Sequence, residues 1–338
     1  MKTFLSALLL FAAYVAGAQR TETFTINLPE NPQVVSGARY GRIRILDSRP
    51  DTASLGVVQL GAFNRLAFVQ PKPSLDLQLQ QLVDVQGGRN ATGALLFQLR
   101  DFRFAELTGS FDEQGWCYLR ANLYAEAGPN QYALLGTLDS MIHFRSMDVT
   151  RGLFRRTSHL LAGFLQAHLA QAYADTALLP YRDLLNLDSI EKSRLPLYTA
   201  NRYQDGLYYS YASLAAQTPD IAEPLPRFSK KGLLKEVKIY MGAAEEVIAP
   251  QEFYALVHDG RIWVTTEFGY YSLRKEGDDF FFNGRLRKTT PTGKAIAAGV
   301  AFGLIGSLMV SGAEVHDALM RIDHLNGGFT PVPEAARH

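Results

Sequence analysis

The chain has 338 residues, of which 47% are hydrophobic and 20% are charged, and its formal net charge is +1. This composition excludes a largely disordered chain, and the length is sufficient for two ordinary domains. The near-zero net charge gives no reason to expect a nucleic acid as partner. Cys117 is the single cysteine, which excludes an intramolecular disulfide, so packing must stabilise each domain.

Residues 1–18 have the pattern of a cleavable signal peptide. Lys2 supplies a positive charge, and the apolar run over 4–15 is short for a bilayer crossing. The small residues Ala16-Gly17-Ala18 predict cleavage before Gln19, and an uncleaved anchor helix is the alternative. Because no cysteine lies near that point, we expect no lipid anchor there. We expect an exported protein of the periplasm or cell envelope.

Residues 19–174 are predicted to form an α+β domain. Alternating apolar and polar residues predict strands over residues 23–28, 42–45, 55–58, 94–104, 116–125 and 131–145. Apolar stripes of helical period predict one helix over 75–85, with Ser74 as its N-cap, and another over 152–173. The apolar phase changes at Asp101, which predicts a bulge. Together these elements predict a mostly antiparallel sheet with two helices on one face.

The rest of the chain differs in character. Residues 175–202 have little sustained period and are predicted to be a connector with one short helix. Residues 203–338 are predicted to form a β-rich domain. Its meander of short strands covers residues 253–258, 261–265, 270–275 and 280–283, and a final strand covers 318–323.

Residues 295–313 carry no charge, and this run is long enough for one bilayer crossing as a helix. Four-residue spacing of Gly299, Gly303 and Ser307, with Gly306 beside them, allows close packing on one helix face. The run is therefore predicted to be one continuous helix that makes the contact with a membrane or partner. A helix buried within the domain is the alternative reading.

The sequence contains none of the common catalytic or nucleotide-binding motifs. The chain has no Gly-x-Ser-x-Gly, no P-loop and no Gly-x-Gly-x-x-Gly, so we expect no cofactor. His159 and His168 lie nine residues apart and so on opposite faces of their helix, and the other histidines, His324 among them, are isolated in the sequence. No metal site and no catalytic residue is predicted.

Two resemblances follow from these patterns. Residues 24–174, with the Ile43-x-Ile45-x-Asp47-x-Arg49 strand end, the helix 75–85, the long strands and the closing helix, resemble the small α+β domain of bacterial envelope lipoproteins that assist transport. The second half, with Asp205-Gly206-Leu207-Tyr208 and the closing Asp323-His324-Leu325-Asn326-Gly327, resembles uncharacterised exported proteins of Bacteroidota. The chain departs from the lipoproteins in lacking their lipid-bearing cysteine.

Short triplets in the chain resemble the O-glycosylation signal that those bacteria use. In each triplet an aspartate precedes the hydroxyl residue, which is Thr52, Thr176 or Ser189. These three residues are therefore candidate modification sites.

These observations favour a non-enzymatic exported envelope protein with a binding or scaffolding role. An envelope protein or the membrane is the expected partner. Two alternatives stay open: an exported hydrolase with a dispersed active site, and a single-span membrane protein that crosses through residues 295–313.

Overall fold

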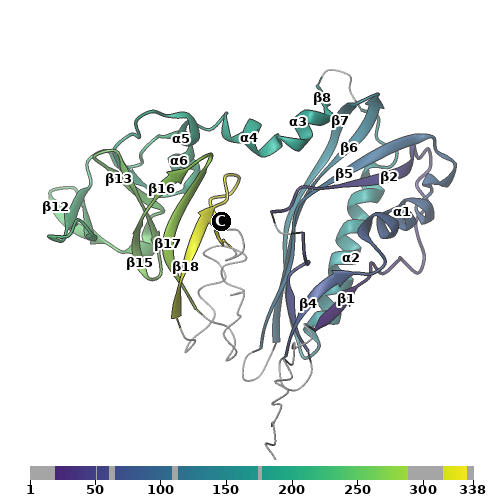
Figure 1. Ribbon diagram of the computed structural model, residues 1–338, viewed down its shortest axis with the longest axis horizontal. Coiled ribbons are helices and arrows are strands. Elements are labelled where there is room, and N and C mark those ends of the chain that lie inside the picture. The colour runs from purple at the N-terminus through teal and green to yellow at the C-terminus, as the bar shows by residue number, and fades with distance from the viewer. Residues whose placement is uncertain are drawn as a thin grey trace, which may run out of the picture.

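The computed structural model describes residues 20–50, 52–60, 65–108, 113–173, 177–287 and 315–332 (Figure 1). The fold is α+β with several antiparallel sheets, which confirms the predicted class. The predicted helix over 295–313, with Gly299, Gly303, Gly306 and Ser307, lies outside the described residues. Within the described ranges, no helix is long and apolar enough to cross a membrane.

The N-terminal half is built on a five-stranded sheet with the order β2-β5-β6-β7-β8. Its strands are β2 (Tyr40–Asp47), β5 (Gly93–Thr108), β6 (Glu113–Gly128), β7 (Gln131–Ser146) and β8 (Leu178–Pro180). β2 is parallel to β5, and the other neighbours are antiparallel. The helices α1 (Leu75–Val85) and α2 (Val149–His168) cover the face turned away from the C-terminal half (Figure 1).

The main core lies between this sheet and its two helices. On β6, Cys117, Leu119 and Ala121 alternate toward the helices and are fully buried, as predicted for Cys117. The β5–β6 register shifts between Leu99 and Asp101, which confirms the predicted bulge. Ser74 occupies the N-cap position of α1, as predicted, although its side chain makes no capping hydrogen bond. By contrast, the side chain of Asp148 does cap α2, by accepting from the Arg151 backbone N–H.

A second, three-stranded sheet extends the first. It has the order β1-β4-β3, formed by β1 (Thr21–Phe24), β4 (Arg65–Pro71) and β3 (Val57–Leu60). Just before β3, Gly56 forms a parallel bridge with Phe104 of β5, so β3 follows β2 along the same side of β5. β1 ends earlier than the strand predicted over 23–28, because Pro29 and the exposed Leu28 belong to the following loop.

Residues 175–202 contain more structure than predicted. β8 is followed by the short helices α3 (Tyr181–Leu185), α4 (Leu187–Lys192) and α5 (Pro196–Thr199). Leu184 of α3 packs with Leu96, Tyr124 and Tyr132 on the second face of the large sheet. These segments were missed because each is too short to show a helical period, and tertiary contacts hold them in place.

The C-terminal half is β-rich and contains the predicted meander, but the strand predicted over 270–275 is divided at Leu273 into two strands that belong to different sheets. It contains β9 (Gly206–Tyr208), α6 (Tyr211–Ala216), β10 (Leu225–Phe228), β11 (Leu234–Met241), β12 (Ala244–Ile248), β13 (Ala255–His258), β14 (Arg261–Thr266), β15 (Gly269–Ser272), β16 (Arg274–Glu276), β17 (Asp279–Arg287), β18 (Val315–Ile322) and β19 (Phe329–Pro331). Its sheets have the orders β10-β11-β12, β15-β14-β13-β9 and β16-β17-β18-β19. The single-turn helices η1 (Gly88–Asn90) and η2 (Pro250–Glu252) complete the described elements.

Candidate functional site

A cleft of about 620 Å³ opens in the N-terminal half between β2, the end of β4 and the first turn of α1. Its size lies within the range of ligand pockets in proteins. Ile43, Ile45 and Leu75 give it an apolar side, while Thr52 and Ser54 contribute hydroxyl groups. The strand end singled out in the sequence, Ile43 to Arg49, therefore lines an open cleft.

The charged side chains of the cleft are mostly paired with one another or with neighbours. Arg49 binds both carboxylate oxygens of Asp47, with nitrogen–oxygen distances of 2.9 and 2.7 Å. Arg44 lies 2.6 Å from Glu126. Asp76, exposed in the first turn of α1, lines the cleft with no ion pair to any described residue. Among the described residues that line the cleft, Asp76 therefore offers its negative charge to an occupant.

The free edge of β2 forms one wall of the cleft. Gln80 of α1 caps the beginning of this edge, accepting from the Ile43 N–H at 3.0 Å and donating to the Gly41 carbonyl at 2.9 Å. Ser48 donates instead to the Leu99 carbonyl of β5. Because backbone groups of alternate residues point to opposite edges of a strand, the N–H and C=O of Ile45 point toward the cleft.

A second polar site joins the two halves of the chain. The turn 323–328 between β18 and β19 approaches the second face of the large sheet. There Arg120 of β6 donates to Asp323 at 2.9 Å and to Asp139 of β7 at 3.2 Å. The amide of Asn326 donates to the Tyr118 hydroxyl at 3.3 Å. These contacts fix the turn on the sheet.

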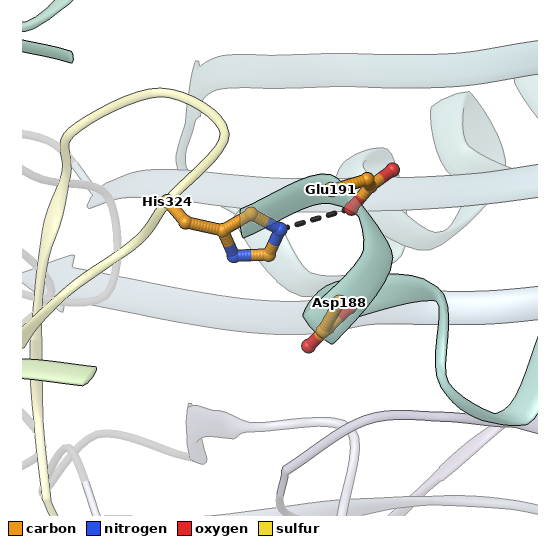
Figure 2. A group of neighbouring side chains, drawn as sticks. All are labelled: Asp188, Glu191 and His324. Carbon is orange, nitrogen blue, oxygen red and sulfur yellow. Dashed lines mark hydrogen bonds and ion pairs between the residues drawn. The ribbon is translucent and has the colours of Figure 1, made fainter. Parts of the chain in front are cut away.

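Next to this turn, two carboxylates and an imidazole gather, as Figure 2 shows. His324 Nε2 lies 2.9 Å from Glu191 Oε2, and Asp188 is on the same short helix, α4. One imidazole and two carboxylates are donor types that zinc accepts. The sequence prediction that His324 is isolated is therefore wrong, because residues that are far apart in the chain meet here.

Arg100 already supplies positive charge to these carboxylates. Its guanidinium makes two hydrogen bonds to Glu191, at 2.8 and 2.6 Å, and one to Asp188 at 2.6 Å. Burial alone raises the pKa of Glu191, but the hydrogen bonds from His324 and Arg100 outweigh it and lower the pKa to about 2. A cation would have to compete with this guanidinium, so we interpret the cluster as an ion-pair network that holds the halves together.

The candidate modification sites are placed differently from one another. Thr52 is exposed and lines the cleft. Ser189 is exposed on α4, one residue after Asp188. Thr176 lies outside the described residues, as do the four residues proposed for helix packing. Of the candidates, the described residues therefore include Thr52, beside the cleft, and Ser189, on α4.

Sequence reasoning missed Arg100, Arg120 and Glu191. Arg100 and Arg120 lie on long strands at positions that alternate with core residues, which is also the pattern of a solvent-facing side. Their side chains are only 7% exposed, and the partners Glu191 and Asp323 come much later in the chain. No local signal could have revealed these pairs.

No protein-family model matches the chain, and no curated protein matches it. Among solved structures, its N-terminal part is similar to the crystal structure of protein XCC0632 from Xanthomonas campestris, of family-model DUF330. The two sequences are 13% identical, the match covers 44% of this chain and 94% of that chain, and the TM-score is 0.27. The resemblance to envelope lipoproteins stays a prediction.

Proposed function

We propose that this protein is an exported, non-catalytic protein of the bacterial envelope, and that its N-terminal half binds a partner protein in the cleft beside β2. The observation that carries the proposal is the cleft itself, which combines an apolar side with a strand edge and an Asp76 carboxylate that have no strand neighbour and no ion-pair partner among the described residues. Such a combination offers both shape and charge for recognition.

Binding is favoured over hydrolysis by the chemistry of the cleft. Thr52, Ser54 and Ser74 carry its hydroxyl groups, and no histidine or cysteine is among the described residues that line it. A hydroxyl nucleophile needs a base within hydrogen-bonding reach. Of the two described carboxylates that line the cleft, Asp47 is held in a bidentate pair by Arg49, and Asp76 makes no hydrogen bond to any of these hydroxyl groups.

Site-specific photo-crosslinking tests this function. A photoreactive amino acid at Gln70, which lines the cleft, should form an adduct with one envelope protein in cells that make this chain. The matched control places the same amino acid at Arg89, which is exposed on η1 and does not line the cleft. Absence of an adduct at Gln70, or equal adducts at both positions, would refute cleft-mediated binding.

Export is tested separately by the mass of the mature protein. Cleavage of the signal peptide predicts an N-terminus at Gln19. A mature protein that keeps residues 1–18 would contradict the proposed export route, and a carbonate wash of the membranes would then distinguish an anchored protein from a peripheral one.

A further inference from the structure

We infer, building on the proposed function, that the occupant of the cleft is an extended segment of the partner protein, added as a strand to the free edge of β2. Within the described part of the chain, β2 pairs only with β5, so its outer edge has no strand neighbour. An exposed edge of this kind can accept another chain through main-chain hydrogen bonds.

The topology of the N-terminal half leaves a strand position open at this point. β3 follows β2 along β5, and β4 pairs with the outer side of β3 in the antiparallel direction. β4 therefore runs toward the end of β2, one strand further out than β3. If β4 continued beyond Pro71, it would run beside the free edge of β2. Instead the chain turns through Lys72 and Pro73 into α1, which starts at Leu75.

The edge is protected at its start and open at its end. Gln80 imitates a neighbouring strand by satisfying the Gly41 carbonyl and the Ile43 N–H. Beyond it, the Ile43 carbonyl, both backbone groups of Ile45 and the Asp47 N–H continue along the same edge toward the cleft. A docked strand of about five residues, roughly 17 Å long, would cover this stretch.

Side chains around the edge define the chemistry of the occupant. Ile45 and Leu75 line one side of the cleft and fit an apolar side chain, and the unpaired Asp76 fits a lysine or arginine. The other charged side chains of the cleft are already paired, Arg49 with Asp47 and Arg44 with Glu126. Because Ile45 and Leu75 pack on the helix-covered side of β2 and Asp76 follows Leu75 on α1, the predicted ligand is an extended segment whose apolar and basic side chains lie on the same face, two residues apart.

A second copy of this chain fits the edge less well. Pairing β2 with β2 of another copy would bring the exposed Arg42 and Arg44 of both copies onto neighbouring strands. Like charges that face each other across strands are destabilising. The charged edge therefore disfavours self-association and favours a partner of different composition.

The test uses a displayed library of random dodecapeptides, panned on the purified full chain. Enriched peptides should carry a basic residue two positions from an apolar residue, so that both side chains lie on one face of the docked strand. Two variants check the site. Thr52→Trp fills the mouth of the cleft and should abolish binding, and Asp76→Lys should weaken it about tenfold or more. The matched control Glu30→Lys reverses an exposed charge that does not line the cleft, and should leave binding unchanged.

Two measurements then distinguish strand addition from other binding in the cleft. The backbone amides of Ile45 and Asp47 should become protected from hydrogen exchange when a selected peptide binds. A copy of that peptide N-methylated at alternate residues should lose binding, because its donors to the edge are removed.

Each outcome bears on the inference. If peptides bind in a Thr52-dependent way but neither amide is protected and N-methylation is tolerated, strand addition is wrong while the cleft keeps its proposed binding function. If no peptide is enriched, or if enriched peptides bind Thr52→Trp equally well, the inferred ligand is wrong, and the photo-crosslinking result decides the function independently. Protection of both amides in a dimer without peptide would identify a second copy as the occupant and also overturn the inference.

Discussion

Replacing Glu191 by glutamine should weaken the junction between the two halves in a pH-dependent way. A carboxyl whose pKa is about 2 in the folded protein and 4.5 in the unfolded chain contributes about 3 kcal/mol at neutral pH. Because the folded pKa is lowered, this contribution is fully present above about pH 4.5 and is lost as the pH falls through 2. Glu191→Gln should therefore lower the free energy of unfolding by about 3 kcal/mol at pH 7.

The matched control is Asp188→Asn on the same helix. The side chain of Asp188 is 57% exposed against 22% for Glu191, and both bind Arg100. An exposed ion pair is worth less than about 1 kcal/mol, so the control should change stability little. Urea unfolding followed by the emission of Trp116 and Trp263, one in each half, measures both variants between pH 3 and 8. Equal losses in the two variants, or a Glu191→Gln effect that does not shrink toward low pH, would refute the reasoning.

Four further predictions follow from buried groups and close contacts. Burial raises the pKa of Glu106 to about 7, so the folded protein is most stable below about pH 4.5 and loses up to about 3 kcal/mol as the pH rises through 7. Glu106→Gln should abolish this decline in the free energy of unfolding, as measured by urea titrations at several pH values. Burial raises the pKa of the Cys117 thiol to about 12, so the native protein should resist a thiol reagent that labels it in denaturant, and rapid native labelling would contradict the burial. Gly152→Ala places a methyl group against the Phe144 ring and should lower the melting temperature at a cost of about 1–3 kcal/mol, whereas Gly163→Ala, with open space in the same helix, should raise it. Gly303→Leu should destabilise the fold or an oligomer by about 1–3 kcal/mol, and Ala297→Leu should destabilise it less. If the two variants have the same melting temperature and cross-link to the same extent, the predicted packed helix over 295–313 is wrong.

The sequence predicted the features that depend on local alternation. Phe97 and Leu99 change phase to Phe102 and Phe104 within one strand, so the bulge at Asp101 was visible without any knowledge of its partner strand. The inward orientation of Cys117 follows from the same period. The core of the N-terminal half was therefore predictable, because each strand and helix carries its own pattern.

The second face of the large sheet was not predictable in the same way. Tyr118, Arg120 and Asn122 alternate with core residues, and a half-buried strand would expose them to solvent. They are buried because α3, α4 and the turn 323–328 pack over that face. The cleft beside β2 was hidden for a related reason, since a missing strand neighbour is a property of topology and leaves no trace in residue composition.

The pairing of Arg120 with Asp323 also bears on how the protein is made. The two residues are separated by 203 positions, so a chain that emerges N-terminus first forms β6 long before the partner of its arginine is synthesised. Until then Arg120 lacks its ion pair with Asp323 and keeps the one with Asp139, and one face of the sheet is uncovered. Contacts over such separations are slow to form, and the intermediate exposes apolar surface. This face of the sheet therefore stays without its cover until the turn 323–328 has been synthesised.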